Sequence, residues 1–218
     1  MTNEKMSRRK FLKTAGVAAG ATVFACSGIT FAATRQPEIE MTEGQYGKGA
    51  DMSKKVLVVY GSRAGSTGEV AEEIGKVLAE AGAQVDVRNV NTVQDVSNYQ
   101  AVVLGSAIRV GNWVPEMISF VENNAAALKN MPAAFFSVCL SLNDSEKQEE
   151  VKVYMDKPKA LLTPASEAVF AGVMDLSKLK LIERLMMKAM KSPIGDFRDW
   201  DAIHGWSKEL TAKLGLAV

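Results

Sequence analysis

A short loop rich in hydroxyl groups and glycine is the part of this 218-residue sequence best suited to chemistry. It lies between an apolar run and a helical pattern, and it consists of Gly61, Ser62, Arg63, Ala64, Gly65, Ser66 and Thr67. Short hydroxyl side chains and glycine at a helix N-terminus can surround a phosphate with O–H and backbone N–H donors, and the helix dipole favours the anion. The loop is therefore a candidate phosphate site. The alternative is a connection that only caps the helix.

The spacing of the loop residues narrows the kind of phosphate. A nucleotide-hydrolysing loop needs Gly-Lys-Ser or Gly-Lys-Thr, and neither occurs in the sequence. The dinucleotide fingerprint G-x-G-x-x-G fails because Arg63 occupies the position of its second glycine. A loop that offers hydroxyl groups in place of lysine or a metal suits a terminal phosphate monoester.

The elements around this loop alternate between strands and helices. Apolar or β-branched runs predict five strands, at residues 54–60, 84–90, 101–107, 133–140 and 167–174. Apolar residues at helical spacing predict helices at residues 67–82, 115–129, 176–191 and 200–214, with a polar, partly helical insertion at residues 143–164. Because strands that alternate with helices imply right-handed crossovers, the expected fold class is α/β, with a doubly wound parallel sheet and helices on both faces.

Composition and charge exclude several classes of protein. With 47% hydrophobic and 23% charged residues, the chain is neither disordered throughout nor a multi-span membrane protein. Residues 1–50 hold seven of the 26 Lys and Arg and four of the 25 Asp and Glu, which leaves 19 basic against 21 acidic residues from 51 to 218. That part lacks the positive field that nucleic-acid binding uses, so no nucleic-acid partner is expected. The sequence has only two cysteines and one histidine, which cannot complete a four-ligand zinc site without carboxylates, so no structural metal is expected.

The first 33 residues have the pattern of a twin-arginine export signal, because Ser7-Arg8-Arg9-Lys10-Phe11-Leu12-Lys13 precedes an uncharged segment at residues 14–33. The alternative is a basic start on a membrane anchor. Two cleavage sites stay open: lipidation of Cys26 within residues 23–26, or a cut near residues 30–32. Residues 34–53 are expected to form a flexible linker and residues 54–218 the folded domain. The protein is expected to be periplasmic or anchored on the outer face of the cytoplasmic membrane.

The strand followed by Ser-x-x-Gly-x-Thr resembles the FMN phosphate loop of the flavodoxin family. The resemblance implies a five-stranded parallel sheet of order 2-1-3-4-5 that binds FMN without a covalent bond. It implies phosphate contacts from the six residues from Ser62 to Thr67. Two later strand ends match the other flavin loops of the family. The second loop comprises Ser106, Ala107, Ile108, Arg109, Gly111, Asn112 and Trp113, and the third comprises Ser137, Val138, Cys139 and Leu140. Ligands bind at such carboxyl ends in open α/β sheets.

Within this superfamily, residues 54–214 resemble most the menaquinone-dependent protoporphyrinogen oxidase branch. The residues that carry this resemblance are Ser62-Arg63-x-Gly65-x-Thr67, Gly105-x-x-Ile108-Arg109-x-Gly111, Met131-Pro132-x-Ala134-Phe135-x-Ser137-Val138, the insertion, and the Met- and Lys-rich segment at 184–191. The resemblance implies an FMN-dependent oxidoreductase that passes electrons to a membrane quinone. Members of that branch are not expected to carry an export signal, so this part of the chain departs from the resemblance. The alternative is an exported flavodoxin-type electron carrier, without small-molecule turnover, that docks on a redox partner protein.

Arg109 distinguishes the second loop from the acidic surroundings of the flavin in free carriers. An arginine beside the ring would stabilise reduced, anionic flavin and raise its redox potential toward that of a quinone. The alternative is that Arg109 pairs with a surface carboxylate. Trp113 either covers the ring or packs beneath the following helix. Cys139 is expected to be a small core residue rather than a redox group, and His204 to be structural.

The segment at residues 176–191 also has two interpretations. Its apolar residues share one face, and Lys180, Arg184, Lys188 and Lys191 lie opposite. That pattern fits a helix packed on a core with a solvated basic face, or a helix in peripheral contact with anionic lipid. The sequence leaves the oligomeric state open.

Overall fold

The computed structural model describes residues 38–49, 54–143, 148–190 and 192–216. Its strands are β1 (Gly44–Tyr46), β2 (Lys55–Gly61), β3 (Gln84–Asn89), β4 (Ala101–Arg109), β5 (Asn112–Trp113), β6 (Ala133–Cys139), β7 (Ser166–Ala171), β8 (Val173–Met174) and β9 (Gly195–Asp196). Its α-helices are α2 (Ser66–Glu80), α3 (Pro115–Leu128), α4 (Gln148–Lys152), α5 (Asp156–Leu161), α6 (Leu181–Ala189) and α7 (Trp200–Lys213). The predicted signal peptide and Cys26 lie outside the described residues.

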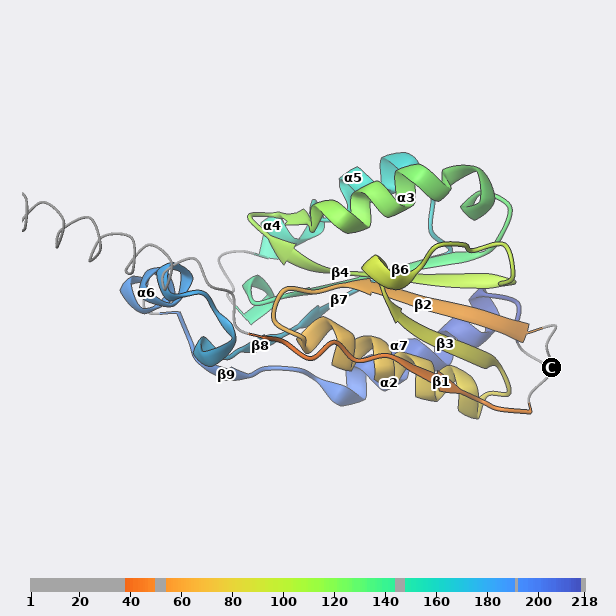
Figure 1. Ribbon diagram of the computed structural model, residues 1–218, viewed down its shortest axis with the longest axis horizontal. Helices are drawn as coiled ribbons and strands as arrows, with labels where there is room; N and C mark the ends of the chain where they lie inside the picture. Colours follow the sequence, from red (N-terminus) through yellow and green to blue (C-terminus); the bar gives the residue numbers. More distant parts are fainter. Residues whose placement is uncertain (1–37, 50–53, 144–147, 191, 217–218) are drawn as a thin grey trace, which may run out of the picture. The chain divides into compact units, whose positions relative to one another are not determined.

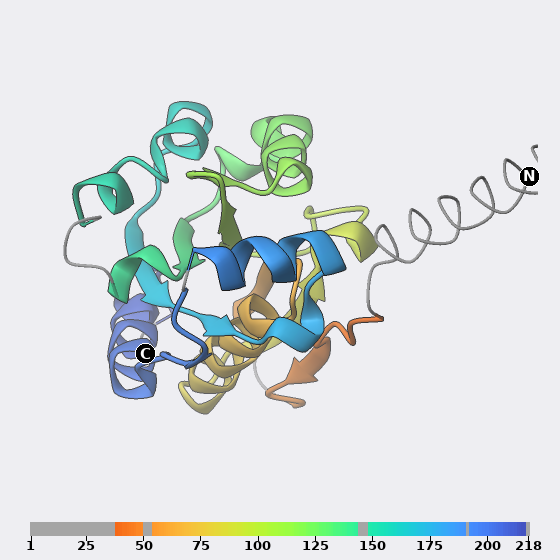
Figure 2. The same ribbon diagram turned by 90° about the vertical axis from the view of Figure 1, so that its left-hand side faces the viewer.

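Five strands form the predicted parallel sheet. Their order is β3-β2-β4-β6-β7, which is the expected 2-1-3-4-5 arrangement, and each neighbouring pair is parallel. Helices α2 and α7 cover one face, and α3 and α5 cover the other (Figures 1 and 2). Parallel strands that lie between two layers of helices are buried on both faces, so their sequences are continuous apolar runs. The predicted fold class is therefore confirmed.

Strand β2 shows how one apolar run supplies two cores. Val56, Val58 and Tyr60 pack with buried residues of α2 and α7, whereas Leu57 and Val59 pack with those of α3. Successive side chains of a strand point to opposite faces, so this alternation follows from the pleat. The strand that leads into the candidate phosphate loop is consequently held from both sides.

A substitution at Gly105 tests how closely the central strands pack. A Cβ at Gly105 would stand 2.0 Å from the ring of Phe136, which is fully buried. Because a packed ring on a neighbouring strand cannot move away freely, Gly105→Ala should lower the free energy of unfolding by about 1–3 kcal/mol. Gly205→Ala on α7 is the matched control, since a Cβ there meets nothing within 4 Å. It should stabilise the protein by about 0.5–1 kcal/mol through helix propensity, as measured by urea unfolding.

The prediction of a flexible linker over residues 34–53 is wrong at residues 44–46. These residues form β1, which pairs antiparallel with β3 through Gly44–Val87 and Tyr46–Val85. Glu43 accepts hydrogen bonds from the backbone N–H of Asn89 (2.9 Å) and from the Thr92 hydroxyl (2.6 Å). A three-residue edge strand is too short to show any period in sequence, yet it pairs the open edge of β3.

Tyr60 anchors the same N-terminal segment to the core. Its buried phenol donates a hydrogen bond to the Thr42 carbonyl oxygen (2.8 Å), and burial raises the pKa of Tyr60 to about 12. Because folding favours the neutral phenol over the phenolate, this contribution to stability is complete below pH 10 and is lost between about pH 10 and 12. Tyr60→Phe should therefore flatten the alkaline loss of stability, as measured by urea unfolding at pH 8, 10 and 11.5. An unchanged loss would place the titration elsewhere, for instance on Tyr46.

The insertion and the segment after β7 depart in detail from the predicted elements. The insertion is partly helical as expected, with α4 and α5. The fifth strand ends at Ala171 rather than at residue 174, because β8 turns away and pairs antiparallel with β9. The single helix predicted for residues 176–191 is wrong. A 3₁₀ turn at Leu176–Lys178 precedes α6, and Lys180 between them has extended backbone, with φ −60° and ψ 153°.

Residues 176–192 fall in a compact unit distinct from that of the sheet, which comprises residues 39–175 and 193–218. Within the described ranges, no helix has both the length and the apolar character needed to cross a bilayer.

Candidate functional site

The three loops singled out in the sequence emerge from neighbouring strands. In the sheet register, Gly61 of β2 pairs with Ser106 of β4, and Ser106 pairs with Ser137 of β6. These residues mark the carboxyl ends of the strands, where an open α/β sheet binds its ligand. The structure thus brings the predicted phosphate loop and both predicted ring loops to one edge of the sheet.

The loop after β2 is a tight turn that leaves the start of α2 open. Gly65 has φ +91°, a left-handed conformation that favours glycine, and its backbone N–H donates to the Ser62 hydroxyl (3.0 Å). Its carbonyl oxygen accepts from the backbone N–H groups of Gly68 (2.8 Å) and Glu69 (3.3 Å). Gly65 is the N-cap residue of α2 and has no side chain with which to cap the helix. Since the first N–H groups of a helix have no partner within it, the turn presents donors to an anion.

Thr67 carries the most specific signal in this loop. Its side-chain oxygen is buried and has no hydrogen-bond partner in the described part of the chain, and the residue is 1% exposed. A buried hydroxyl without a partner costs about 1–3 kcal/mol, so it needs a reason. The first turn of an uncapped helix is where a phosphate oxygen would accept from that hydroxyl. The residues present therefore fit a phosphate monoester.

The remaining loop residues have different surroundings. Arg63 is exposed, and its guanidinium forms an ion pair with Glu116 of α3 (2.8 Å). Ala64 and Ser66 are half-buried. The Arg63 side chain therefore pairs with the Glu116 carboxylate. Ser66 and Thr67, the first two residues of α2, supply the hydroxyl groups nearest the start of that helix.

The polar side chains of the second and third loops hold the loops to each other. The Ser106 hydroxyl donates to the Ala107 carbonyl oxygen (2.9 Å) and accepts from the backbone N–H of Val114 (3.0 Å). The Trp113 indole N–H donates to the Ser137 hydroxyl (2.8 Å). Both serines are fully buried and their hydroxyl groups bond inside the fold, so their predicted contacts with a ligand would have to involve the backbone.

Trp113 takes the packing role of the two that the sequence leaves open. It is 3% exposed, and its ring lies 5.2 Å from that of Phe135, between centroids. It belongs to the core beneath α3. The sequence could not separate the two roles, because the same position precedes a helix and follows a predicted ring loop.

The tip of the β4–β5 hairpin is the most exposed part of the second loop. Ala107 and Ile108 are half-buried, whereas Arg109, Gly111 and Asn112 are exposed. Val110 lies between them with φ +50° and is 99% exposed. A β-branched residue in the left-handed region is strained, and such strain gathers at functional loops. Sequence reasoning missed Val110, because nothing local in the sequence indicates its backbone angle.

The third loop is closed by the insertion. Val138 and Cys139 are buried, Leu140 is half-buried, and Cys139 packs with Val151 and Tyr154. Burial raises the pKa of the Cys139 thiol, which keeps it protonated and agrees with a small core residue. The Tyr154 phenol donates to the Ser141 hydroxyl (3.1 Å). Tyr154 is a second residue that the sequence could not assign to this edge, because its position depends on the folding of the insertion.

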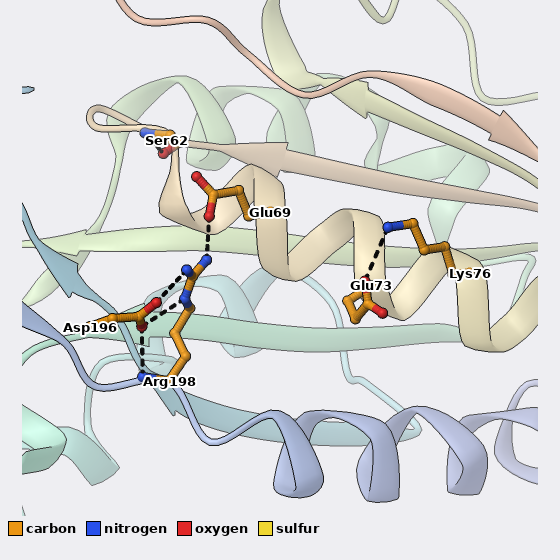
Figure 3. Close-up of polar contacts among 7 residues, drawn as sticks. Ser62, Glu69, Glu73, Lys76, Asp196 and Arg198 are labelled. Atoms are coloured by element: carbon orange, nitrogen blue, oxygen red, sulfur yellow. Dashed lines mark hydrogen bonds and ion pairs between the residues drawn. The ribbon is translucent and has the colours of Figure 1, made fainter.

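An arginine far along the chain stabilises the start of α2 (Figure 3). Arg198 donates to both carboxylate oxygens of Asp196 (2.9 and 2.5 Å), which lowers the pKa of that carboxyl, and it forms an ion pair with Glu69 in the first turn of α2. Its guanidinium also lies over the ring of Trp200 at 4.5 Å. Arg198 thereby compensates the charge of Glu69 beside the candidate phosphate site. His204 lies 3.4 Å from Glu73 of the same helix.

Two family comparisons match the chain. Residues 57–201 match a family described as "Flavodoxin domain", and residues 5–25 match one described as "TAT (twin-arginine translocation) pathway signal sequence". These matches confirm the predicted resemblance and the predicted export signal.

The sequence is also similar to named proteins. It is 31% identical over 170 residues to the protoporphyrinogen IX dehydrogenase (quinone) of Escherichia coli K12, over 72% of this chain and 94% of that protein. It is 27% identical over 185 residues to the protein of that name from Leishmania major, over 78% and 79% of the two chains. Among solved structures, the flavodoxin of Streptococcus pneumoniae TIGR4 superimposes with a TM-score of 0.50 at 19% identity, over 73% of this chain and 99% of that one. This last likeness supports the fold.

Proposed function

The chain belongs to the flavodoxin-domain family, and from this premise we propose that it is an exported, FMN-dependent oxidoreductase that passes electrons from a porphyrinogen to a membrane quinone. Its homologues are oxidoreductases, and flavodoxin domains bind FMN. The homology to the Escherichia coli enzyme extends over most of both chains and supports the choice of substrate class. The twin-arginine signal supports export, to the periplasm or to the outer face of the cytoplasmic membrane.

The observation that carries the proposal is the buried hydroxyl of Thr67 near the start of α2, which has no hydrogen-bond partner among the described residues. A phosphate at this point gives that hydroxyl an acceptor and meets the open N–H groups of the helix. Ser62 and Gly65 hold the turn in shape through their mutual hydrogen bond. These features support the proposal that the phosphate of FMN would bind at this turn.

The residues around the ring would divide the remaining work. Bound FMN would supply two-electron redox chemistry. Arg109, at the end of β4, would bring positive charge to the ring and favour its reduced state. The insertion, through Val151 and Tyr154 packed against Cys139, would shield the third loop from water. Val110 and Gly111 at the hairpin tip would contact the incoming substrate or acceptor.

Purification under native conditions tests the proposal. The protein should be yellow, release FMN on denaturation, and show a flavin that a porphyrinogen reduces and a menaquinone analogue reoxidises under anaerobic conditions. A colourless protein that refuses added FMN would contradict the cofactor assignment. A bound flavin that no quinone analogue reoxidises would contradict the quinone step and agree with an electron carrier.

A further inference from the structure

Helix α6 has an exposed apolar face. Five apolar side chains on this helix and the residue after it are exposed, by 41%, 54%, 59%, 53% and 63%: Leu181, Ile182, Leu185, Met186 and Met190. Their spacing of one, three and four residues places them on one side of the helix. No residue of α6 is buried. The described residues thus give α6 no buried position, which favours the alternative of peripheral contact.

The rest of the segment is positively charged. Residues 176–190 contain four basic side chains, Lys178, Lys180, Arg184 and Lys188, against one acidic side chain, Glu183. The Glu183 carboxylate accepts from the backbone N–H of Lys180 (3.1 Å) and so serves as the cap of α6. Arg184 donates to the Leu179 carbonyl oxygen (3.5 Å). An apolar face with basic flanks is the pattern of a helix that lies in a membrane interface.

From these two faces we infer that α6 docks on anionic phospholipid. The acyl region would take the leucine, isoleucine and methionine side chains, and the lipid phosphates would pair with the basic flanks. Nine helical residues extend about 13 Å, which is too short to span a hydrocarbon core of about 30 Å, so the helix lies in the plane of the interface.

Charge and export distinguish lipid from other occupants. Two copies of α6 packed face to face would bring two positive flanks together, which is unfavourable. The twin-arginine signal takes the chain to a membrane, where an anionic surface is at hand. The inference deepens the proposed function and rests on it only in that the quinone acceptor lies in the same bilayer.

A fluorophore on α6 tests the contact in the full-length, FMN-loaded chain. In a Cys26→Ser background, Met190→Cys would carry a polarity-sensitive label, and Val153→Cys, at a site 57% exposed, would carry it as the matched control. Vesicles of phosphatidylglycerol should shift the emission to the blue at position 190 alone, and a quencher within the bilayer should suppress it. Phosphatidylcholine vesicles and high salt should reduce both effects.

A charge on the apolar face should then abolish the contact. Leu185→Glu, at a site 59% exposed, should weaken the binding of the labelled α6 to the vesicles by at least about tenfold, whereas Val153→Glu should not change it. Equal signals at positions 190 and 153, or none at 190, would overturn the inference. So would sedimentation showing a lipid-free dimer that Leu185→Glu dissociates. Quinone reduction in detergent separates the two failures, because it tests the proposed function without a bilayer.

Discussion

Replacing Thr67 by valine is expected to weaken FMN binding by about tenfold to a hundredfold and, at the same time, to stabilise the flavin-free protein. A hydrogen bond from the hydroxyl to a charged phosphate contributes about 1.5–3 kcal/mol, and each 1.4 kcal/mol is a factor of ten in affinity. Without flavin, the same hydroxyl is buried and has no partner in the described residues. Its removal should therefore raise the free energy of unfolding, by about 1 kcal/mol.

The opposite signs make Thr67→Val informative. Affinity would be measured by titrating FMN into the flavin-free protein and following the quenching of flavin fluorescence, and stability by urea unfolding. Ser207→Ala is the matched control, because Ser207 is also a buried helical hydroxyl but donates to the Ile203 carbonyl oxygen (2.7 Å). That variant should keep its FMN affinity. A Thr67→Val protein with lower stability and unchanged affinity would show that the hydroxyl serves the fold and not a phosphate.

The regular part of the fold could be predicted from the sequence because burial acts on every residue of its strands. Residues 56–60 are apolar without interruption, and the structure covers them on both faces. The helix expected at residues 67–82 is observed at Ser66–Glu80, with the apolar side chains of Val70 and Ile74 in the core. The edge strand β1 could not be predicted, since its place depends on β3, some 40 residues later in the chain.

The site shows the same division between local and distant causes. The turn of the candidate phosphate loop is local, and its serine and glycine residues already indicate it. The ion pair between Glu69 and Arg198 joins residues 129 positions apart, and no local pattern points to it. The internal bond between Trp113 and Ser137 likewise depends on the register of β4 and β6. Side chains that look available in the sequence, such as Trp113 and Ser137, are therefore used by the fold, whereas the Thr67 hydroxyl has no partner in the part of the chain that the structure describes.

Arg109→Ala is expected to lower the two-electron midpoint potential of the bound flavin by about 30–60 mV. Reduction adds negative charge to the ring, and a guanidinium beside the ring would stabilise that charge by about 1.5–3 kcal/mol. For a two-electron couple, each 1.4 kcal/mol corresponds to about 30 mV of midpoint potential. Arg109→Lys should retain part of the effect, because the charge stays while the planar pair of donors is lost. Lys208→Ala, at an exposed position on α7, is the control for loss of one positive charge.

Anaerobic titration with dyes of known potential would measure these values, together with FMN affinity and quinone reoxidation for each variant. A lower potential leaves less driving force from substrate to flavin and more from flavin to quinone. Arg109→Ala should therefore slow flavin reduction by the porphyrinogen without slowing reoxidation by the quinone. A merely structural role of Arg109 would not change the two rates in this unequal way. An unchanged potential with unchanged affinity would mean that Arg109 serves a surface carboxylate, and the wild-type potential would then decide alone between a quinone-linked enzyme and a low-potential carrier.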